Sequence, residues 1–123
     1  MYEVKVLSEF SASHHLRDYG GKCERRHGHN WKVEIICEAD TLDNIGLVVD
    51  FKWLKEKVKV IVEELDHVEL NDLDYFKKFN PSSENIAYYI FMQLSKAPEI
   101  TQKVRLRRVN IWENDSSRAS YYE

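Results

Sequence analysis

His27 and His29, two histidines separated by one glycine, form the pattern in this chain with the clearest chemical potential. On a β-strand, residues i and i+2 point to the same face, so both imidazoles could reach one metal ion. A catalytic zinc site usually takes three protein ligands and keeps one position open. The pair could equally be the polar end of a strand, so a third ligand on a matching face is needed to decide.

The third ligand is expected near the amino terminus, where His14 and His15 are adjacent. Residues 2–14 alternate between apolar and polar side chains, which is the pattern of a half-buried strand. His14 has the parity of the apolar residues Phe10 and Ala12, whereas His15 has the opposite parity. The alternation therefore favours His14 as the third ligand.

Cys23 precedes His27 by four residues, in a polar loop that also contains Arg25 and Arg26. Nearby cations and a metal lower the pKa of a thiol and favour the thiolate. Such a thiolate could act as a general base or nucleophile beside the metal. Two alternatives remain open: an inert loop thiol, or a fourth ligand that closes a purely structural metal site.

Two further groups could take part in acid–base chemistry or binding. Asp66 and His67 follow an amphipathic stretch, and a carboxylate that orients an imidazole is a recurring acid–base arrangement. The alternative is a solvated helix end. Glu113 shares the parity of apolar neighbours, and an inward carboxylate needs a partner. That partner could be the amidine-like N–H pair of a pterin or guanine, or an arginine among residues 105–108.

The elements that must position these groups follow from hydrophobic periodicity. Alternation predicts strands, whereas the three- and four-residue spacing from Phe51 to Leu65, after a plausible N-cap at Asp50, predicts a helix. A second helix begins near Ser82 and stops before Pro98. The order β-β-α-α-β-β indicates an α+β architecture, an antiparallel sheet with the helices on one face. The expected strands cover residues 2–14, 27–39, 103–113 and 118–122.

Length and composition limit the class of protein. The 123 residues suit one domain spanning residues 1–123, and the net charge of -3 argues against a nucleic-acid binder. No apolar run is long enough to span a bilayer and no leader is apparent, so we expect a cytoplasmic protein without a membrane partner. Two cysteines are too few for a disulfide scaffold.

Several spaced motifs together resemble the 6-pyruvoyl-tetrahydropterin synthase family, over essentially the whole chain. Three residues separate Cys23 from His27, which is similar to the bacterial 6-carboxy-5,6,7,8-tetrahydropterin synthases of queuosine biosynthesis; animal-type members have a longer spacing. The matching motifs are Phe10-Ser-Ala-Ser-His14, Cys23-Glu-Arg-Arg-His27-Gly-His29-Asn-Trp, Gly46-Leu-Val-Val-Asp50-Phe51, Leu65-Asp66-His67-Val-Glu-Leu-Asn71-Asp72, Asn80-Pro81-Ser82-Ser83-Glu84-Asn85 and Trp112-Glu113.

The resemblance implies a T-fold, a four-stranded antiparallel sheet with two helices on one face. Three subunits would join their sheets into a barrel, and two rings would stack into a homohexamer. It also implies roles for individual residues. The implied zinc ligands are His14, His27 and His29, the proton-transfer groups Cys23, Asp66 and His67, and the pterin-binding residues Glu113, Ser82, Ser83 and Glu84.

The implied reaction converts 7,8-dihydroneopterin triphosphate into 6-carboxytetrahydropterin, with release of acetaldehyde and triphosphate. One alternative is the 6-pyruvoyl-tetrahydropterin synthase reaction, which eliminates triphosphate and keeps the three-carbon side chain. A more distant alternative is a zinc-stabilised binding module without catalysis, in which Cys23 would be the fourth ligand.

Overall fold

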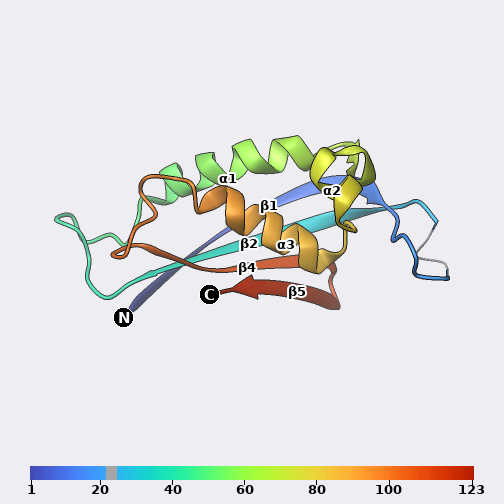
Figure 1. Cartoon of the computed structure of the whole chain (residues 1–123). Coiled ribbons are helices and arrows are strands. Elements are labelled where there is room, and N and C mark those ends of the chain that lie inside the picture. Colours follow the sequence, from blue (N-terminus) through green and yellow to red (C-terminus); the bar gives the residue numbers. More distant parts are fainter. Residues whose placement is uncertain (22–24) are drawn as a thin grey trace.

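The computed structural model describes residues 1–21 and 25–123. A five-stranded sheet forms one layer of the molecule, and the helices form the other (Figure 1). The strand order is β3-β1-β2-β4-β5. Every neighbouring pair is antiparallel except β1 and β3, which are parallel. The strands are β1 (Tyr2–His14), β2 (His27–Ala39), β3 (Val68–Glu69), β4 (Arg105–Asn114) and β5 (Ser117–Tyr122).

The helices lie on one face of this sheet, as Figure 1 shows, and the predicted α+β class is confirmed. They are α1 (Phe51–Leu65), α2 (Asp74–Lys78) and α3 (Ser83–Leu94), with a 3-10 turn, η2 (Leu70–Asp72), before α2. Within the described residues, no helix is long and apolar enough to cross a membrane.

The expectation of four strands and two helices was wrong in detail. The structure adds the fifth strand β3 and the short helix α2, both within the stretch between the two long helices. β3 has only two residues, so it carries no alternation to detect. Its pairing with Ala12 and Ser13 depends on an edge of β1 that lies far away in sequence.

The predicted helix starts are confirmed by capping hydrogen bonds. The Asp50 carboxylate accepts the backbone N–H of Lys52 at 2.8 Å. The Ser82 hydroxyl accepts the backbone N–H of Asn85 at 3.1 Å at the start of α3. Each cap satisfies a donor that the first helical turn leaves without an internal partner.

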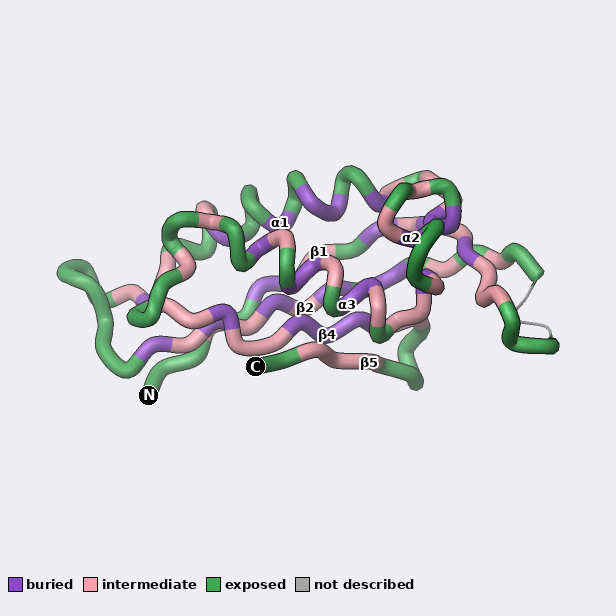
Figure 2. The backbone as a smooth tube through the Cα atoms, viewed as in Figure 1, coloured by how far each residue is buried: buried purple, intermediate pink, exposed green. Residues whose placement is uncertain are grey.

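The core fills the space between the helices and the sheet, where Figure 2 shows the buried stretches of both layers facing each other. Register in the β1–β2 pair places Phe10 opposite Trp31 and His14 opposite His27. Trp31 is fully buried and His14 is 2% exposed. The apolar face of the two central strands therefore continues, at one end, directly into a group of histidines.

Candidate metal centre

Three histidines and one glutamate converge where β1, β2 and β4 meet. The ligand atoms of His14, His27, His29 and Glu113 all lie within 4.8 Å of one another. The Nε2 atoms of His14 and His27 are 3.0 Å apart. Glu113 Oε1 lies 3.4 Å from His14 Nε2 and 3.2 Å from His29 Nε2. The structure thus brings the three predicted ligands together and adds a carboxylate to them.

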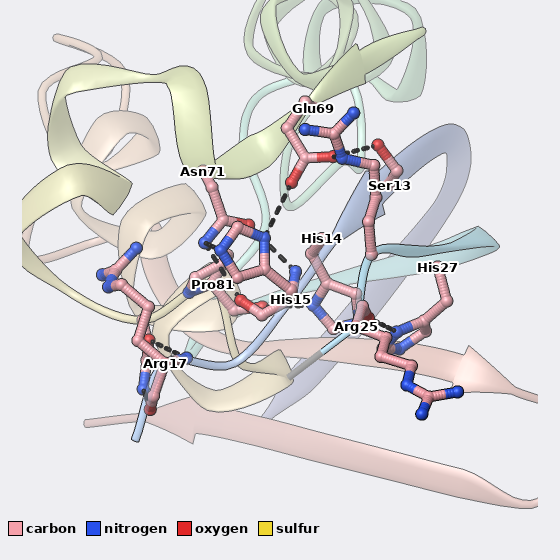
Figure 3. A network of polar contacts seen from close by, with 11 residues as sticks. Ser13, His14, His15, Arg17, Arg25, His27, Glu69, Asn71 and Pro81 are labelled. Carbon is pink, nitrogen blue, oxygen red and sulfur yellow. Dashed lines mark hydrogen bonds and ion pairs between the residues drawn. The ribbon is translucent and has the colours of Figure 1, made fainter. Parts of the chain in front are cut away.

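Hydrogen bonds fix the orientation of two of these rings. His14 Nδ1 lies 2.7 Å from the carbonyl oxygen of Pro81, and His27 Nδ1 lies 2.8 Å from that of Arg25 (Figure 3). A carbonyl oxygen only accepts, so each Nδ1 carries a proton, and in the tautomer that this selects Nε2 presents its lone pair. Metal-binding histidines characteristically donate their second N–H in this way.

The facing lone pairs of His14 and His27 call for a cation between them. Two acceptors 3.0 Å apart repel each other when no proton or metal ion lies between. Bonds of about 2.0–2.1 Å in a tetrahedral zinc site place ligand nitrogens about 3.3 Å apart, close to the observed separation. His29 Nε2 is also buried, and its 3.2 Å contact with Glu113 Oε1 lacks hydrogen-bond geometry, so among the described residues it has no hydrogen-bond partner. The donor set therefore fits a divalent transition metal.

The electrostatic environment keeps the rings in the metal-binding form. Burial lowers the pKa of His14, and the neighbouring histidines lower it further against the opposing effects of the Pro81 hydrogen bond and Glu113. Burial also lowers the pKa of His29, again against the pull of Glu113. Both rings are consequently neutral near pH 7, as metal ligands must be.

Glu113 reaches the histidines because it lies on the same face of β4 as Val109 and Ile111, the face that continues the buried side of β2. The β4–β5 register shifts between Trp112 and Asn114, so Glu113 has no partner on β5. Among the described residues, the arginines of the same strand have other partners: Arg105 and Arg107 pair with Glu38, and the Arg108 guanidinium lies 4.0 Å from the centre of the Tyr122 ring.

Glu113 also lines a surface hollow of about 380 Å³ together with Ser83 and Glu84. Three of the four predicted pterin-binding residues thus share one cavity. Ser82 is not among the lining residues, and its hydroxyl caps α3. Arg118 on β5 also lines the hollow, with its guanidinium 5.7 Å from the Trp112 ring. Sequence reasoning missed Arg118, since nothing in the pattern of β5 marks it.

Asp66 and His67 form a rigid pair at the edge of β1. Asp66 Oδ2 lies 2.8 Å from His67 Nδ1, and Asp66 Oδ1 accepts the backbone N–H of Ser11 at 2.8 Å. The Ser11 hydrogen bond, and then His67, lower the pKa of Asp66. His67 has a left-handed backbone with φ 56°, held by its own N–H bond to the Ser11 carbonyl at 2.6 Å. The His67 side chain is 81% exposed.

The pair lies beside an open groove of about 500 Å³ that both His67 and the metal-ligand candidate His29 line. Glu69 lines the same groove and binds Arg26, with Glu69 Oε2 2.9 Å from Arg26 Nε. Cys23 lies outside the described residues, so its role stays a prediction.

The fold and the site together define a small α+β protein with a group of histidines and a glutamate that could hold a metal ion, at the end of its two central strands. Residues 3–123 match the model of the 6-pyruvoyl tetrahydropterin synthase family. The chain belongs to this family, as its spaced motifs predicted, and is therefore an enzyme of the lyase class.

Individual relatives place the chain among several named activities. It is 35% identical to the 6-carboxy-5,6,7,8-tetrahydropterin synthase of Synechocystis sp., over 99% of this chain and 94% of that protein. It is 33% identical to the dihydroneopterin monophosphate aldolase of Pyrococcus furiosus, over 88% and 86%. The structure of Caenorhabditis elegans 6-pyruvoyl tetrahydropterin synthase superposes with a TM-score of 0.86 at 26% identity, covering 99% and 95%. This likeness confirms the T-fold.

Proposed function

We propose that this chain is a zinc-dependent 6-carboxy-5,6,7,8-tetrahydropterin synthase. It would convert 7,8-dihydroneopterin triphosphate and one water molecule into 6-carboxytetrahydropterin, acetaldehyde and triphosphate. The single observation that carries the proposal is the position of Glu113, which belongs both to the hollow and to the histidine cluster. A pterin ring anchored there would have its side chain beside the metal. The similarity to the Synechocystis enzyme supports the same reaction.

Glu113 would bind the 2-amino-pyrimidinone edge of the pterin through two parallel hydrogen bonds. A carboxylate that receives two N–H donors forms a strong, oriented pair, which fixes the ring in its plane. Ser83 and Glu84 line the same hollow and would contact the ring from the start of α3. Ser82 would contribute less directly, by holding that helix start in place.

His14, His27 and His29 would hold the zinc ion. When bound, the ion supplies Lewis acidity that makes the side-chain hydroxyls and the adjacent C–H of the substrate more acidic. The two Nδ1–H···O=C hydrogen bonds keep the rings of His14 and His27 directed at the ion. Burial of His14 also excludes bulk water from that side of the site.

Proton transfer would fall to Cys23 and to the Asp66–His67 pair. Asp66 accepts from His67 Nδ1, which leaves His67 Nε2 free to take up or release a proton. We assign Cys23 as the thiolate base that removes the side-chain proton. His67 is so exposed in the single chain that a neighbouring subunit would complete its surroundings.

Self-association fits the open edges of the sheet. β3 covers β1 only at Ala12 and Ser13, and in the described chain β5 pairs only with β4. Unpaired edges are ready to pair with another strand. We therefore propose assembly into a homohexamer, a dimer of trimers, in which subunits supply walls to one another's sites.

Product identification after incubation with 7,8-dihydroneopterin triphosphate tests the proposal. Mass spectrometry should find 6-carboxytetrahydropterin and acetaldehyde in equal amounts. A product that keeps the three-carbon side chain would instead establish the 6-pyruvoyl-tetrahydropterin synthase reaction. The similarity to the Pyrococcus aldolase makes dihydroneopterin monophosphate the second substrate to try, since an aldol cleavage leaves a one-carbon alcohol on the ring. Unfolding on chelation without any turnover would indicate a structural zinc module.

A further inference from the structure

The main chain of β1 leaves the sheet immediately after the metal-ligand candidate His14. Its last rung with β2 is His14 opposite His27, and β3 pairs only with Ala12 and Ser13. Backbone N–H and C=O groups that leave a ladder still need hydrogen-bond partners. The segment that follows His14 must therefore be held by something other than a strand.

Two asparagine side chains take over this task. Asn71 Oδ1 accepts the backbone N–H of His15 at 2.9 Å, and Asn71 Nδ2 donates to the His15 carbonyl at 3.0 Å. Asn80 does the same for Arg17, with both hydrogen bonds at 3.0 Å. A carboxamide offers both an acceptor and donors, so each side chain replaces one peptide group of a missing strand. Figure 3 shows Asn71 against His15.

We propose that Asn71 and Asn80, together the amide clamp, are positioning residues for the metal ligand His14. The clamp fixes the backbone directly after His14. Asn80 also precedes Pro81, whose carbonyl oxygen accepts the Nδ1–H of His14 at 2.7 Å. The Asn80 carbonyl is in turn held by Asn85 Nδ2 at 2.8 Å, which ties this segment to α3.

The clamp therefore controls both determinants of the His14 imidazole, its backbone position and its ring orientation. Outer contacts of this kind commonly change metal affinity by about 10–100-fold when they are removed. The inference rests on the proposed metal site, but it concerns affinity for the ion and not the fate of the substrate. It can therefore be tested without any pterin.

The isosteric substitutions Asn71→Asp and Asn80→Asp test the clamp. Each substitution keeps Oδ1, which accepts the backbone N–H of His15 or Arg17. Each replaces the donor Nδ2 by a second oxygen, which then faces the backbone carbonyl of the same residue. Asn30→Asp is the matched control. Asn30 Oδ1 only accepts, from the Ser11 hydroxyl at 2.7 Å, so a carboxylate keeps this hydrogen bond. The control adds the same negative charge next to a metal ligand.

Zinc affinity of the metal-free proteins should be measured by competition with a chromophoric chelator, alongside the absorption spectrum of the Co²⁺ form and thermal unfolding without metal. Asn71→Asp and Asn80→Asp should weaken zinc binding about 10–100-fold and alter the Co²⁺ spectrum. Asn30→Asp should stay within about twofold of wild type. A charge effect alone would strengthen cation binding, so the expected weakening is not an artefact of charge.

Wild-type zinc affinity and an unchanged Co²⁺ spectrum in the folded variants would overturn the clamp, even if their unfolding temperatures fell. Asn71 is 8% exposed, and a buried charge there could prevent folding. Asn80 is only half-buried. If Asn71→Asp does not fold, the zinc affinity and Co²⁺ spectrum of Asn80→Asp therefore decide whether the clamp holds. A wild-type chain that binds neither ion would overturn the metal site and the clamp together. If the two variants lose zinc affinity as expected but the wild-type chain makes a different pterin product, only the proposed reaction is overturned.

Discussion

His14 and His27 are direct partners on the last rung of the β1–β2 ladder. Residues opposed in this way have Cβ atoms about 4.5–5.5 Å apart, a distance at which two imidazoles can share one ion. The register of the sheet therefore sets the spacing of these two candidate ligands. The long ladder behind them, from Tyr2 opposite Ala39 onward, keeps that register from slipping.

Removal of a ring from this rung should abolish metal binding. We expect His14→Ala and His27→Ala to contain little zinc after dialysis, as measured by elemental analysis of the purified proteins. His15→Ala is the matched control, because His15 is adjacent in sequence and its Nδ1 instead lies 3.4 Å from Glu69. Full zinc content in both ligand variants would refute the assignment.

Replacement of the Cys23 thiol should separate catalysis from metal binding. We expect Cys23→Ala to lower turnover about 10²–10⁴-fold while its zinc content stays unchanged. Zinc loss in this variant would instead identify Cys23 as a fourth ligand. Cys37→Ala is the control: burial raises the pKa of Cys37 to about 12, so this thiol stays protonated and should be dispensable for turnover.

The left-handed backbone of His67 predicts opposite effects on stability and activity. Such a conformation costs a non-glycine residue roughly 1–3 kcal/mol, whereas glycine adopts it freely but loses more entropy on folding. His67→Gly should therefore raise the free energy of unfolding by up to about 1 kcal/mol in urea titrations, and lower turnover about 10²–10⁴-fold. Asp18, with φ 64°, provides the control. Asp18→Gly should be stabilised similarly with normal turnover; a destabilised His67→Gly would contradict the strain argument.

Acid should destabilise the metal-free protein in a defined pH range. Burial lowers the pKa of His14 and His29 below 6.5 in the folded state, while the unfolded chain protonates near 6.5. Between these values the unfolded state binds more protons, so the free energy of unfolding falls as the pH falls and levels off below the folded pKa. Urea titrations between pH 8 and pH 4.5 with chelator should show this loss. His14→Gln should show a smaller one, and an equal slope in both proteins would refute the assignment to His14.

Sequence alternation alone could predict that His14, and not His15, lies on the inward face of β1 beside the other two histidines. Phe10 and Ala12 lie on the buried face of β1, and a period of two carries that face to His14. The same reasoning placed His27 and His29 together on β2. A half-buried strand has only two faces, so alternation assigns each residue to one of them.

Contacts between distant segments could not be predicted in this way. Alternation indicated that Glu113 faces inward, but its approach to the histidines depends on the β2–β4 register, which has no local signal. Asn71 and Asn80 contact backbone positions 56 and 63 residues away. Asparagine in a polar stretch is ordinarily a turn residue, so its role as a substitute strand emerges only from the three-dimensional structure.

The shared position of Glu113 has a thermodynamic consequence. Its carboxylate belongs to the ligand cluster and also lines the hollow, so an ion at one and a pterin at the other would contact the same charge. The two binding equilibria are then coupled, and the coupling free energy is reciprocal. Whatever factor zinc imposes on the affinity for the pterin, the pterin must impose on the affinity for zinc, and Glu113→Gln should shrink both factors together.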